Sequence, residues 1–468
     1  MSDLVEVIEK YSLISLLLLR MDELETRLRN ADARIVELET ENRSLRDQLI
    51  AKNSRNSSKP PSTEMVPPKR TKSLREPTNR KQGGQPGHKG SNLKMETKPD
   101  VIDKRMPAYC NHCGSNLSDT PAAFIGKRQV IDIPPIVPIV TEQQIYARTC
   151  TCGHITCGKY SPNANAPVGY GENIESMVAY FHARQYLPVG RMKELFKDVL
   201  GTPISTGGIC HLLNRFARKT TPVHELIKKR LQNSPFVGSD ETGCKVNGKL
   251  HWFWTWQSPN LTYIAHSGSR GKKAIEDNFP NGFPNAILGS DAWRAQLNTP
   301  AKGHQLCTAH MLRELNHLKE LYSKDPWAGR FSQLLHRALK LRYKMEQNNA
   351  ICPERDRVGI MERFQELIAE PPDSDNKKAH TFFKRISKNH GHIFTFLTDI
   401  AVPPDNNSSE RAIRNIKVKQ KVSGQFKADH SAMGYAKIRS VIDTTIKNSQ
   451  NVLEVLRLIA RNDFSLEA

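Results

Sequence analysis

Three acidic residues stand where the sequence predicts that strands end and a helix begins. Asp240 and Asp291 each follow a short apolar stretch, and Glu410 follows the Pro-, Asn- and Ser-rich segment 403–409. Hard cations such as Mg2+ prefer carboxylate oxygens, and converging carboxylates can hold two ions about 3.5–4 Å apart across a phosphodiester. We therefore interpret Asp240, Asp291 and Glu410 as catalytic residues that bind two Mg2+ ions.

The elements that must position these acids follow the predicted order β-β-β-α-β-α-β-α. We expect strands at 236–239, 250–257 and 261–266 with a turn at 246–249, a helix at 271–278, strands at 286–290 and 305–307, and a helix from about residue 309. This order matches a ribonuclease-H-like fold, in which acids at the end of the first strand, just after the fourth strand and on a late helix converge. The sequence thus predicts an α/β catalytic domain in which Asp240 ends the first strand.

Glu410 opens a predicted basic helix. Helical spacing places Arg414, Lys417 and Lys421 on the face of Glu410, where cations could hold DNA phosphates. We predict nucleic-acid contacts for the five cations that follow the acid: Arg411, Arg414, Lys417, Lys419 and Lys421.

Several alternatives stay open around these acids. Asp405 and Glu241 are rivals that sequence spacing does not exclude, and a single glutamate in a basic helix is commonly a surface residue. Cys307-x-x-His310 opens the helix after the fifth strand. A metal site would need more ligands, so we interpret this motif as a buried thiol and a capping or phosphate-facing histidine.

Two closely spaced cysteine pairs lie nearer the N-terminus: Cys110-x-x-Cys113 and Cys150-x-Cys152. Such pairs, bracketing the strand-like stretches 129–133 and 139–140, can place four thiolates tetrahedrally around Zn2+. We therefore predict a structural zinc-ribbon-like module whose ligands are these four cysteines. His154 or Cys157 is close enough to replace one ligand, and a set of unmetallated thiols is the alternative.

A heptad repeat runs through the N-terminal segment. Apolar residues recur from Met21 with alternating gaps of three and four, and a polar Asn42 occupies an a position. A narrow seam of this kind predicts a coiled coil, and a polar a residue favours two strands in register. A parallel homodimer would also make three attractive pairs: Arg27–Asp32, Arg34–Glu39 and Glu41–Arg46. A helix that folds back on its own chain is the alternative.

The chain is strongly basic, with 69 Lys and Arg against 48 Asp and Glu and a net charge of +21. This balance favours a polyanionic partner, for which double-stranded DNA is the obvious candidate. Residues 191–215 form two amphipathic stretches separated by 201–205, which is one pattern of a helix-turn-helix, although such turns join packed helices in many proteins.

The predicted fold is a multidomain α+β protein with eight segments. They are a coiled-coil helix (1–52), a basic linker (53–105), the zinc module (106–165), a helical, possible helix-turn-helix region (166–232), the first part of the catalytic core (233–323), a helical insertion (324–399), the Glu-bearing helix of the core (400–426) and a C-terminal helical segment (427–468).

The longest apolar run, 13–19, is too short to cross a bilayer, and no signal peptide is recognisable. We therefore expect a cytoplasmic, nucleoid-associated protein without a membrane partner. In that reducing compartment the nine cysteines are expected as metal ligands or thiols.

Taken in order, these motifs resemble the transposases of the insertion-sequence sixty-six group. The resemblance rests on the segments 56–62 and 83–90, the paired cysteines, Ser239-Asp240-Glu241-Thr242-Gly243, Cys307-x-x-His310-x-x-Arg313 and Asp405-Asn406-Asn407-Ser408-Ser409-Glu410-Arg411. This chain departs from the family at 419–422, where the family commonly shows an Arg-Lys-Asn run.

The resemblance implies a DDE nuclease and strand transferase that cuts at terminal inverted repeats and joins the 3′ ends to target DNA. Asp240, Asp291 and Glu410 carry over as its catalytic residues, and small accessory proteins of the same element are implied as partners. Two other functions remain: a catalytically inactive DNA-binding or regulatory protein derived from a transposase, and an RNA-cleaving ribonuclease H.

Overall fold

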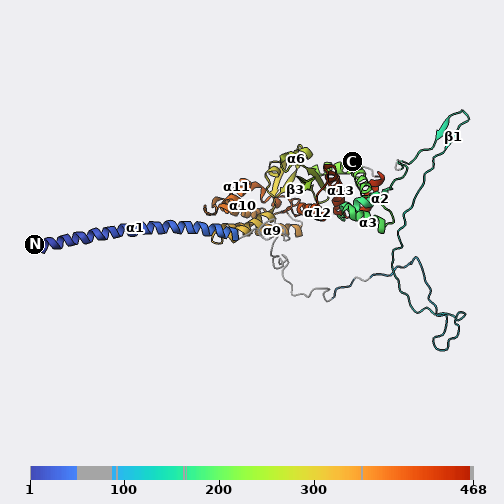
Figure 1. The fold of residues 1–468 in the computed structure, drawn as a ribbon, viewed down its shortest axis with the longest axis horizontal. Coiled ribbons are helices and arrows are strands. Elements are labelled where there is room, and N and C mark those ends of the chain that lie inside the picture. The colour runs from blue at the N-terminus through green and yellow to red at the C-terminus, as the bar shows by residue number, and fades with distance from the viewer. Residues whose placement is uncertain are drawn as a thin grey trace.

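The computed structural model describes residues 2–49, 87–90, 93–161, 164, 166–348 and 351–463, so most of the predicted basic linker lies outside the described residues. Figure 1 shows the long helix α1, a packed part that begins with α2, and an extended segment, residues 93–161, that precedes α2. Within the described residues, no helix is both long enough and apolar enough to cross a membrane.

Helix α1 (Ser2–Leu49) is a single continuous helix, as the heptad pattern predicts. Its exposed surface carries Arg–Glu pairs three or four residues apart, such as Arg20–Glu23 and Arg29–Glu25. The apolar residues of the seam are also exposed: Met21, Leu24, Leu28, Ile35, Leu38 and Leu45. An isolated helix with an uncovered apolar seam gains little from burial, so its two-stranded partner stays a prediction.

The segment that carries the cysteines holds one short hairpin, β1 (Ala147–Thr149) with β2 (Ile155–Cys157). The predicted strands at 129–133 and 139–140 are wrong. Val130 and Ile139 are more than nine-tenths exposed, and within the part of the chain that the structure describes no strand pairs with them. Prolines at 134, 135 and 138 further interrupt any ladder, because proline has no N–H to donate.

The five-stranded sheet has the strand order β5-β4-β3-β6-β7. Its strands are β3 (Phe236–Val246), β4 (Lys249–Gln257), β5 (Thr262–Ser267), β6 (Phe283–Ser290) and β7 (Ala301–Leu306). Strands β3, β4 and β5 are antiparallel neighbours, whereas β6 and β7 run parallel to β3. Helix α6 (Lys272–Asn278) precedes β6, and α7 (Arg294–Leu297) precedes β7. The predicted element order is therefore confirmed.

The first strand is longer than predicted, and Asp240 lies inside it. Residues 240–246 continue in antiparallel pairing with β4 around a two-residue turn in which Asn247 and Gly248 both have positive φ. Parallel pairing with β6, however, stops at Gly238. The sequence was wrong about the end of the strand, and Asp240 instead stands just beyond the point where β3 and β6 diverge.

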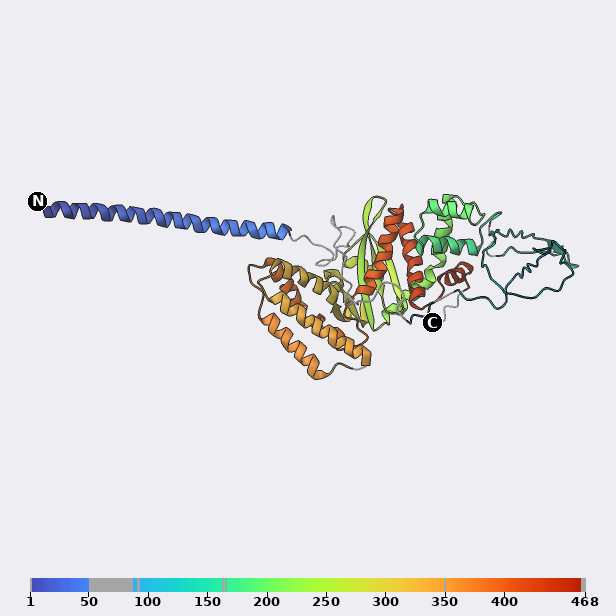
Figure 2. The ribbon, with the colours of Figure 1, turned by 90° about the horizontal axis from the view of Figure 1, so that it is seen from below.

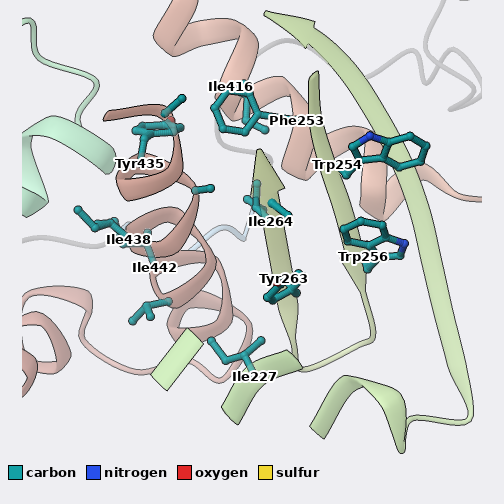
Figure 3. Packing of buried hydrophobic residues seen from close by; sticks show 14 of the residues in the cluster. Ile227, Phe253, Trp254, Trp256, Tyr263, Ile264, Ile416, Tyr435, Ile438 and Ile442 are labelled. Atoms are coloured by element: carbon teal, nitrogen blue, oxygen red, sulfur yellow. The ribbon is translucent and has the colours of Figure 1, made fainter. Parts of the chain in front are cut away.

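Helices cover both faces of this sheet (Figure 2). On one face, α13 (Asp429–Lys447) runs along β5, and its Tyr435, Ile438 and Ile442 share a core with Phe253 and Ile264 (Figure 3). Helices α5 (Thr221–Gln232) and α14 (Val452–Arg461) join this core. Residues 429–461 thus pack on the five-stranded sheet.

A second core on the other face is formed by the predicted insertion (324–399) together with the helix before it. It comprises α8 (Thr308–Leu321), α9 (Trp327–Asn348), α10 (Glu354–Ala369), α11 (Lys377–Lys388) and the short helices η2 (His390–His392) and η3 (Thr395–Leu397). Trp327, Phe331, Phe364 and Phe382 fill its centre, and Phe236 and Ile287 of the sheet pack against it. The amphipathic stretches between the fifth strand and Glu410 are therefore helices packed on the sheet.

A third, smaller core unites α2 (Glu172–Ala183), α3 (Val189–Asp198) and α4 (Thr206–Lys219). Helices α3 and α4 are joined at the predicted turn, and the Ser205 hydroxyl caps α4 by accepting a bond from the Gly208 N–H at 3.0 Å. Met192 and Phe196 of α3 are buried with Ile209 and Leu212 of α4. The two-helix pattern is therefore present, and its use in DNA binding stays a prediction.

Candidate active site

Asp240 and Asp291 come from two neighbouring strands at the same edge. Asp240 lies on β3 just past its divergence from β6, and Asp291 follows the last residue of β6. The N–H of Glu241 donates to the Asp240 carboxylate at 2.8 Å. Ala292, directly after Asp291, has φ +66°, a left-handed conformation that β-carbon contacts disfavour and that the surrounding structure must hold. The fork between β3 and β6 thus places Asp240 close enough to Asp291 for the two carboxylates to repel each other.

Glu410 reaches this edge because α12 (Asn407–Ser423) begins directly against β3. The buried Asn406 side chain donates to the Ser239 carbonyl at 2.7 Å and accepts a bond from the Ser409 hydroxyl at 2.6 Å. A β-carbon on Gly238 would lie 2.7 Å from both the Asn406 Oδ1 and the Ser409 Oγ. Only glycine at 238 therefore permits this close approach of helix and strand.

The segment before α12 is also fastened to α8. The N–H and the hydroxyl of Thr308 both donate to the Pro404 carbonyl, at 3.0 and 2.8 Å. The Asn406 N–H donates to the buried Cys307 sulfur at 3.2 Å. Helix α8, which follows the fifth strand, and α12 are thereby fixed with respect to each other.

Two side chains of α8 connect the acids. His310 Nδ1 lies 2.9 Å from Asp291 Oδ1, and His310 Nε2 lies 3.5 Å from Glu410 Oε1. Arg313, one helical turn further on, donates to Glu410 Oε1 at 2.8 Å, and Arg414 lies 3.5 Å from Glu410 Oε2. Through His310 the structure links Asp291 to Glu410, which is only about one-sixth exposed, and Asp240 lies close enough to interact electrostatically with Asp291 and His310.

The electrostatics of the site reflect crowded carboxylates. Burial, followed by repulsion from Asp291 and Glu241, raises the pKa of Asp240 well above its usual value. Burial by itself would lower the pKa of His310, but its contacts with the side chains of Asp291 and Cys307 outweigh this effect and raise the pKa to about 10. The imidazole of His310 thus lies between two carboxylates.

The two rivals of the triad have other partners. Glu241 accepts two bonds from the Arg270 guanidinium, at 2.9 and 3.0 Å, and one from Gln296 at 2.9 Å. Arg270 is itself sandwiched between the rings of Trp252 and Trp293, at 4.9 and 4.1 Å from the ring centres. Glu241 is therefore held by a cation on the far side of β3.

The other rival, Asp405, has a local structural role. It accepts a bond from the Asn407 N–H at 3.0 Å, which is the turn that starts α12.

The donor set of the site fits divalent cations. Asp291 Oδ1 is buried and has no aligned hydrogen-bond donor, although His310 is close. Among the described residues, Asp291, Cys307 and His310 form a tight group of potential ligand atoms. Glu410 lies 3.5 Å from His310 Nε2, and Asp240 interacts electrostatically with Asp291 and His310. Carboxylates spread in this way, with one raised pKa and one orphaned oxygen, suit the hard-cation chemistry of Mg2+.

The cations of α12 divide into two classes. Arg411, Arg414, Lys417 and Lys421 are exposed. Lys419 is only 3% exposed, and its ammonium lies 3.1 Å from His182 Nδ1 and 3.2 Å from the Leu187 carbonyl. The prediction of a DNA contact at Lys419 is therefore wrong, because this side chain points into the interface between α12 and α2.

The two cysteine pairs each form a tight local turn. The Gly114 N–H donates to the Cys110 carbonyl at 2.9 Å, and the Gly153 N–H donates to the Cys150 carbonyl at 2.8 Å. Bonds from Ser115, and then from Cys110, lower the pKa of Cys113 to about 7, which favours the metal-binding thiolate. Within the described residues the four sulfurs do not form a single group, so each pair is shaped only by its own turn.

Sequence reasoning missed several residues that build the site. His310 and Arg313 were seen in a motif, and their spacing of three on one helix face was the available signal for a shared partner. Asn406 was also seen in a motif, but its contact with Ser239, the close approach at Gly238 and the Arg270 sandwich had no such signal, since each depends on contacts between distant segments.

Comparisons with known proteins agree with this architecture. A family model described as zinc-finger binding domain of transposase IS66 matches residues 107–153, which contain all four cysteines. A family of unknown function matches residues 9–94. No curated protein matches the chain. A family model described as Transposase IS66 family matches residues 168–434, more than half of the sequence, including the sheet and the three acids. The chain therefore belongs to the IS66 transposase family.

Proposed function

We propose that this chain is a DDE-type transposase that cleaves DNA at the ends of its insertion sequence and joins the 3′ ends to target DNA. The observation that carries the proposal is the convergence of Asp240, Asp291 and Glu410 at the fork between β3 and β6. A ribonuclease-H-like assignment is supported by the sheet, in which three antiparallel strands are followed by two strands parallel to the first.

The acids would hold two Mg2+ ions, and Asp240, Asp291 and Glu410 are the residues that supply the ligand oxygens. When bound, such ions activate a hydroxyl nucleophile and stabilise the leaving oxygen of a phosphodiester. Arg313 and Arg414 hold the Glu410 carboxylate from both of its oxygens. His310 keeps Asp291 and Glu410 apart by a fixed spacing and neutralises part of their charge.

DNA would run along the exposed cations of α12. Arg414 is 72% exposed while it contacts Glu410, so its guanidinium is open to a phosphate beside the acids. Lys417 donates to the Gly243 carbonyl at 3.2 Å, which places it over β3. Helices α3 and α4 offer a second DNA-binding element, and the zinc-finger region with the basic linker offers a third.

A homodimer through α1 completes the proposal. The apolar seam of α1 is exposed in one chain, and a second α1 in register would cover it. Two catalytic sites joined by one coiled coil would allow the two ends of an element to be held together.

The decisive experiment uses purified full-length protein, Mg2+ and labelled DNA that carries the ends of the element encoding it. The wild type is expected to nick and join these ends. Asp240→Asn is expected to lower the rate of nicking and joining at least about 1000-fold, because the mechanism requires metal-bound oxygens. Its DNA affinity should stay within about twofold of the wild-type value. Asp277→Asn, an exposed acid on α6, is the matched control and should keep full activity. Activity of Asp240→Asn equal to that of the wild type would refute the assignment, and a wild type that binds the ends without cutting would identify a regulatory protein.

A further inference from the structure

A second group of metal-type ligands lies away from the acidic site. It consists of His251 on β4, His266 on β5 and Asp429, the first residue of α13. His251 pairs across the sheet with Cys244, four residues along β3 from Asp240, or about 13 Å at the usual rise of a strand. The three residues come from three separate elements, so only the tertiary fold assembles them.

The distances between the ligand atoms have the dimensions of a metal site. His251 Nδ1 and His266 Nε2 are 3.1 Å apart, and Asp429 Oδ1 lies 3.5 Å from the first nitrogen and 4.0 Å from the second. Ligands that bind one tetrahedral Zn2+ at about 2.0–2.1 Å are separated from one another by about 3.3 Å. The observed separations bracket that value, and a small movement of the exposed Asp429 side chain would equalise them.

The two histidines form the enclosed end of the group. The His266 side chain is 5% exposed and the His251 side chain 18%, whereas Asp429 is 66% exposed. The group is therefore closed at its histidine end and open to solvent at its carboxylate, which gives an ion a path of entry.

An ion bound to this group would connect the loop between α12 and α13 to the sheet. The loop between α12 and α13 is tied to the β3–β4 hairpin: the Asn247 N–H donates to the Phe426 carbonyl at 2.9 Å, and the Phe426 N–H donates to the Lys245 carbonyl at 3.0 Å. Asp429 follows this loop and starts the helix that covers β5. A ligand bridge at 251, 266 and 429 would fasten the end of that loop to the sheet.

We propose that His251, His266 and Asp429 bind one structural Zn2+ ion, with a fourth position open to water. Two imidazole nitrogens and one carboxylate oxygen suit zinc and related late first-row ions better than Mg2+. The ion would crosslink β4, β5 and α13 and so stabilise the path of the chain that leads away from the Glu410-bearing helix. This site is separate from the cysteine pairs and from the acidic triad, and it does not depend on catalysis.

The test measures zinc bound to the untagged full-length chain, loaded with ZnCl2 and freed of unbound ion by gel filtration, with mass-spectrometric detection of the metal. Asp429→Asn and His251→Ala are each expected to carry one ion per chain fewer than the wild type. Asp429→Asn changes an exposed side chain, so it tests the site without disturbing the core. His430→Ala, an exposed histidine next to the site, is the matched control and should keep the wild-type content.

A second measurement separates this site from the cysteine module. Added ZnCl2 is expected to raise the thermal midpoint of a Cys110→Ser, Cys113→Ser variant, and this rise should disappear when Asp429→Asn is added to the same chain. Equal zinc content in the wild type, His251→Ala and Asp429→Asn would overturn the proposal, as would a zinc-induced rise that Asp429→Asn leaves intact.

Discussion

The cysteine module and the acidic site bring potential metal ligands together in opposite ways. In the module, each pair of cysteines is separated by one or two residues and is shaped by its own tight turn, while the surrounding apolar side chains stay exposed. In the acidic site, the proposed ligands lie on β3, directly after β6 and on α12, and two hydrophobic cores hold these elements in place. Local spacing therefore reveals ligands of the first kind, whereas packing creates sites of the second kind.

The largest effect on the acidic site is expected from crowding the contact between β3 and α12. Gly238→Ala is expected to lower strand-transfer activity at least about 100-fold and to cost about 1–3 kcal/mol in the free energy of unfolding, because its β-carbon would collide with Asn406 and Ser409. Activity assays and chemical denaturation measure the two effects. Gly329→Ala in α9, where a β-carbon meets nothing within 4 Å, is the control and should be neutral or slightly stabilising. An active Gly238→Ala variant would show that the close approach is dispensable.

A smaller effect is expected from the residue that positions Glu410. Arg313→Ala removes the 2.8 Å bond to the carboxylate and should reduce activity about 10–100-fold, with a higher Mg2+ concentration needed for half-maximal rate. Arg313→Lys should recover part of the loss because it keeps the charge. Arg330→Ala, which breaks an exposed pair with Glu370, should change neither value. A purely structural role would be indicated if the Mg2+ dependence of Arg313→Ala matched that of the wild type.

The independence of the cysteine module can be tested by removing one thiol. Cys113→Ser is expected to make residues 93–161 sensitive to limited proteolysis and to leave the thermal midpoint of the packed part within about 2 °C, since none of the four sulfurs belongs to a hydrophobic core. Proteolysis followed by mass spectrometry, and calorimetry, provide the readouts. A large fall in the midpoint would mean that module and packed part stabilise each other.

The smallest expected effect concerns the buried cation of α12. Burial lowers the pKa of Lys419 to about 7, below its value in the unfolded chain, so the unfolded state binds more protons between about pH 7 and 10. The free energy of unfolding of the wild type should therefore rise with pH across that window, and the rise should be weaker in Lys419→Met. Denaturation curves at several pH values measure this dependence.

DNA binding gives the matching control for that cation. Affinity for DNA should be unchanged in Lys419→Met and reduced in Lys417→Ala, whose side chain is exposed, with a salt dependence lower by about one counterion. A loss of affinity in Lys419→Met equal to that of Lys417→Ala would contradict the buried position.

Periodicity predicted much of the fold because each element shows its own pattern. Alternating and aromatic-rich stretches identified the strands of the sheet, and the Asn247-Gly248 turn identified their hairpin. Periodicity also indicates the buried position of Lys419, since Ile413, Ile416 and Lys419 recur at spacings of three along the buried face of α12. The strands expected between the cysteine pairs were wrong because β-propensity cannot form a ladder without a partner.

The amino-acid sequence by itself determined which residues could bind metal or DNA and in what order the elements follow one another. Only the tertiary structure decided that His310 lies between Asp291 and Glu410, that β3 leaves β6 just before Asp240, and that His251, His266 and Asp429 meet. The physical reason is range: hydrogen bonding and side-chain periodicity act over a few residues, whereas these meetings depend on how whole faces of helices and strands pack.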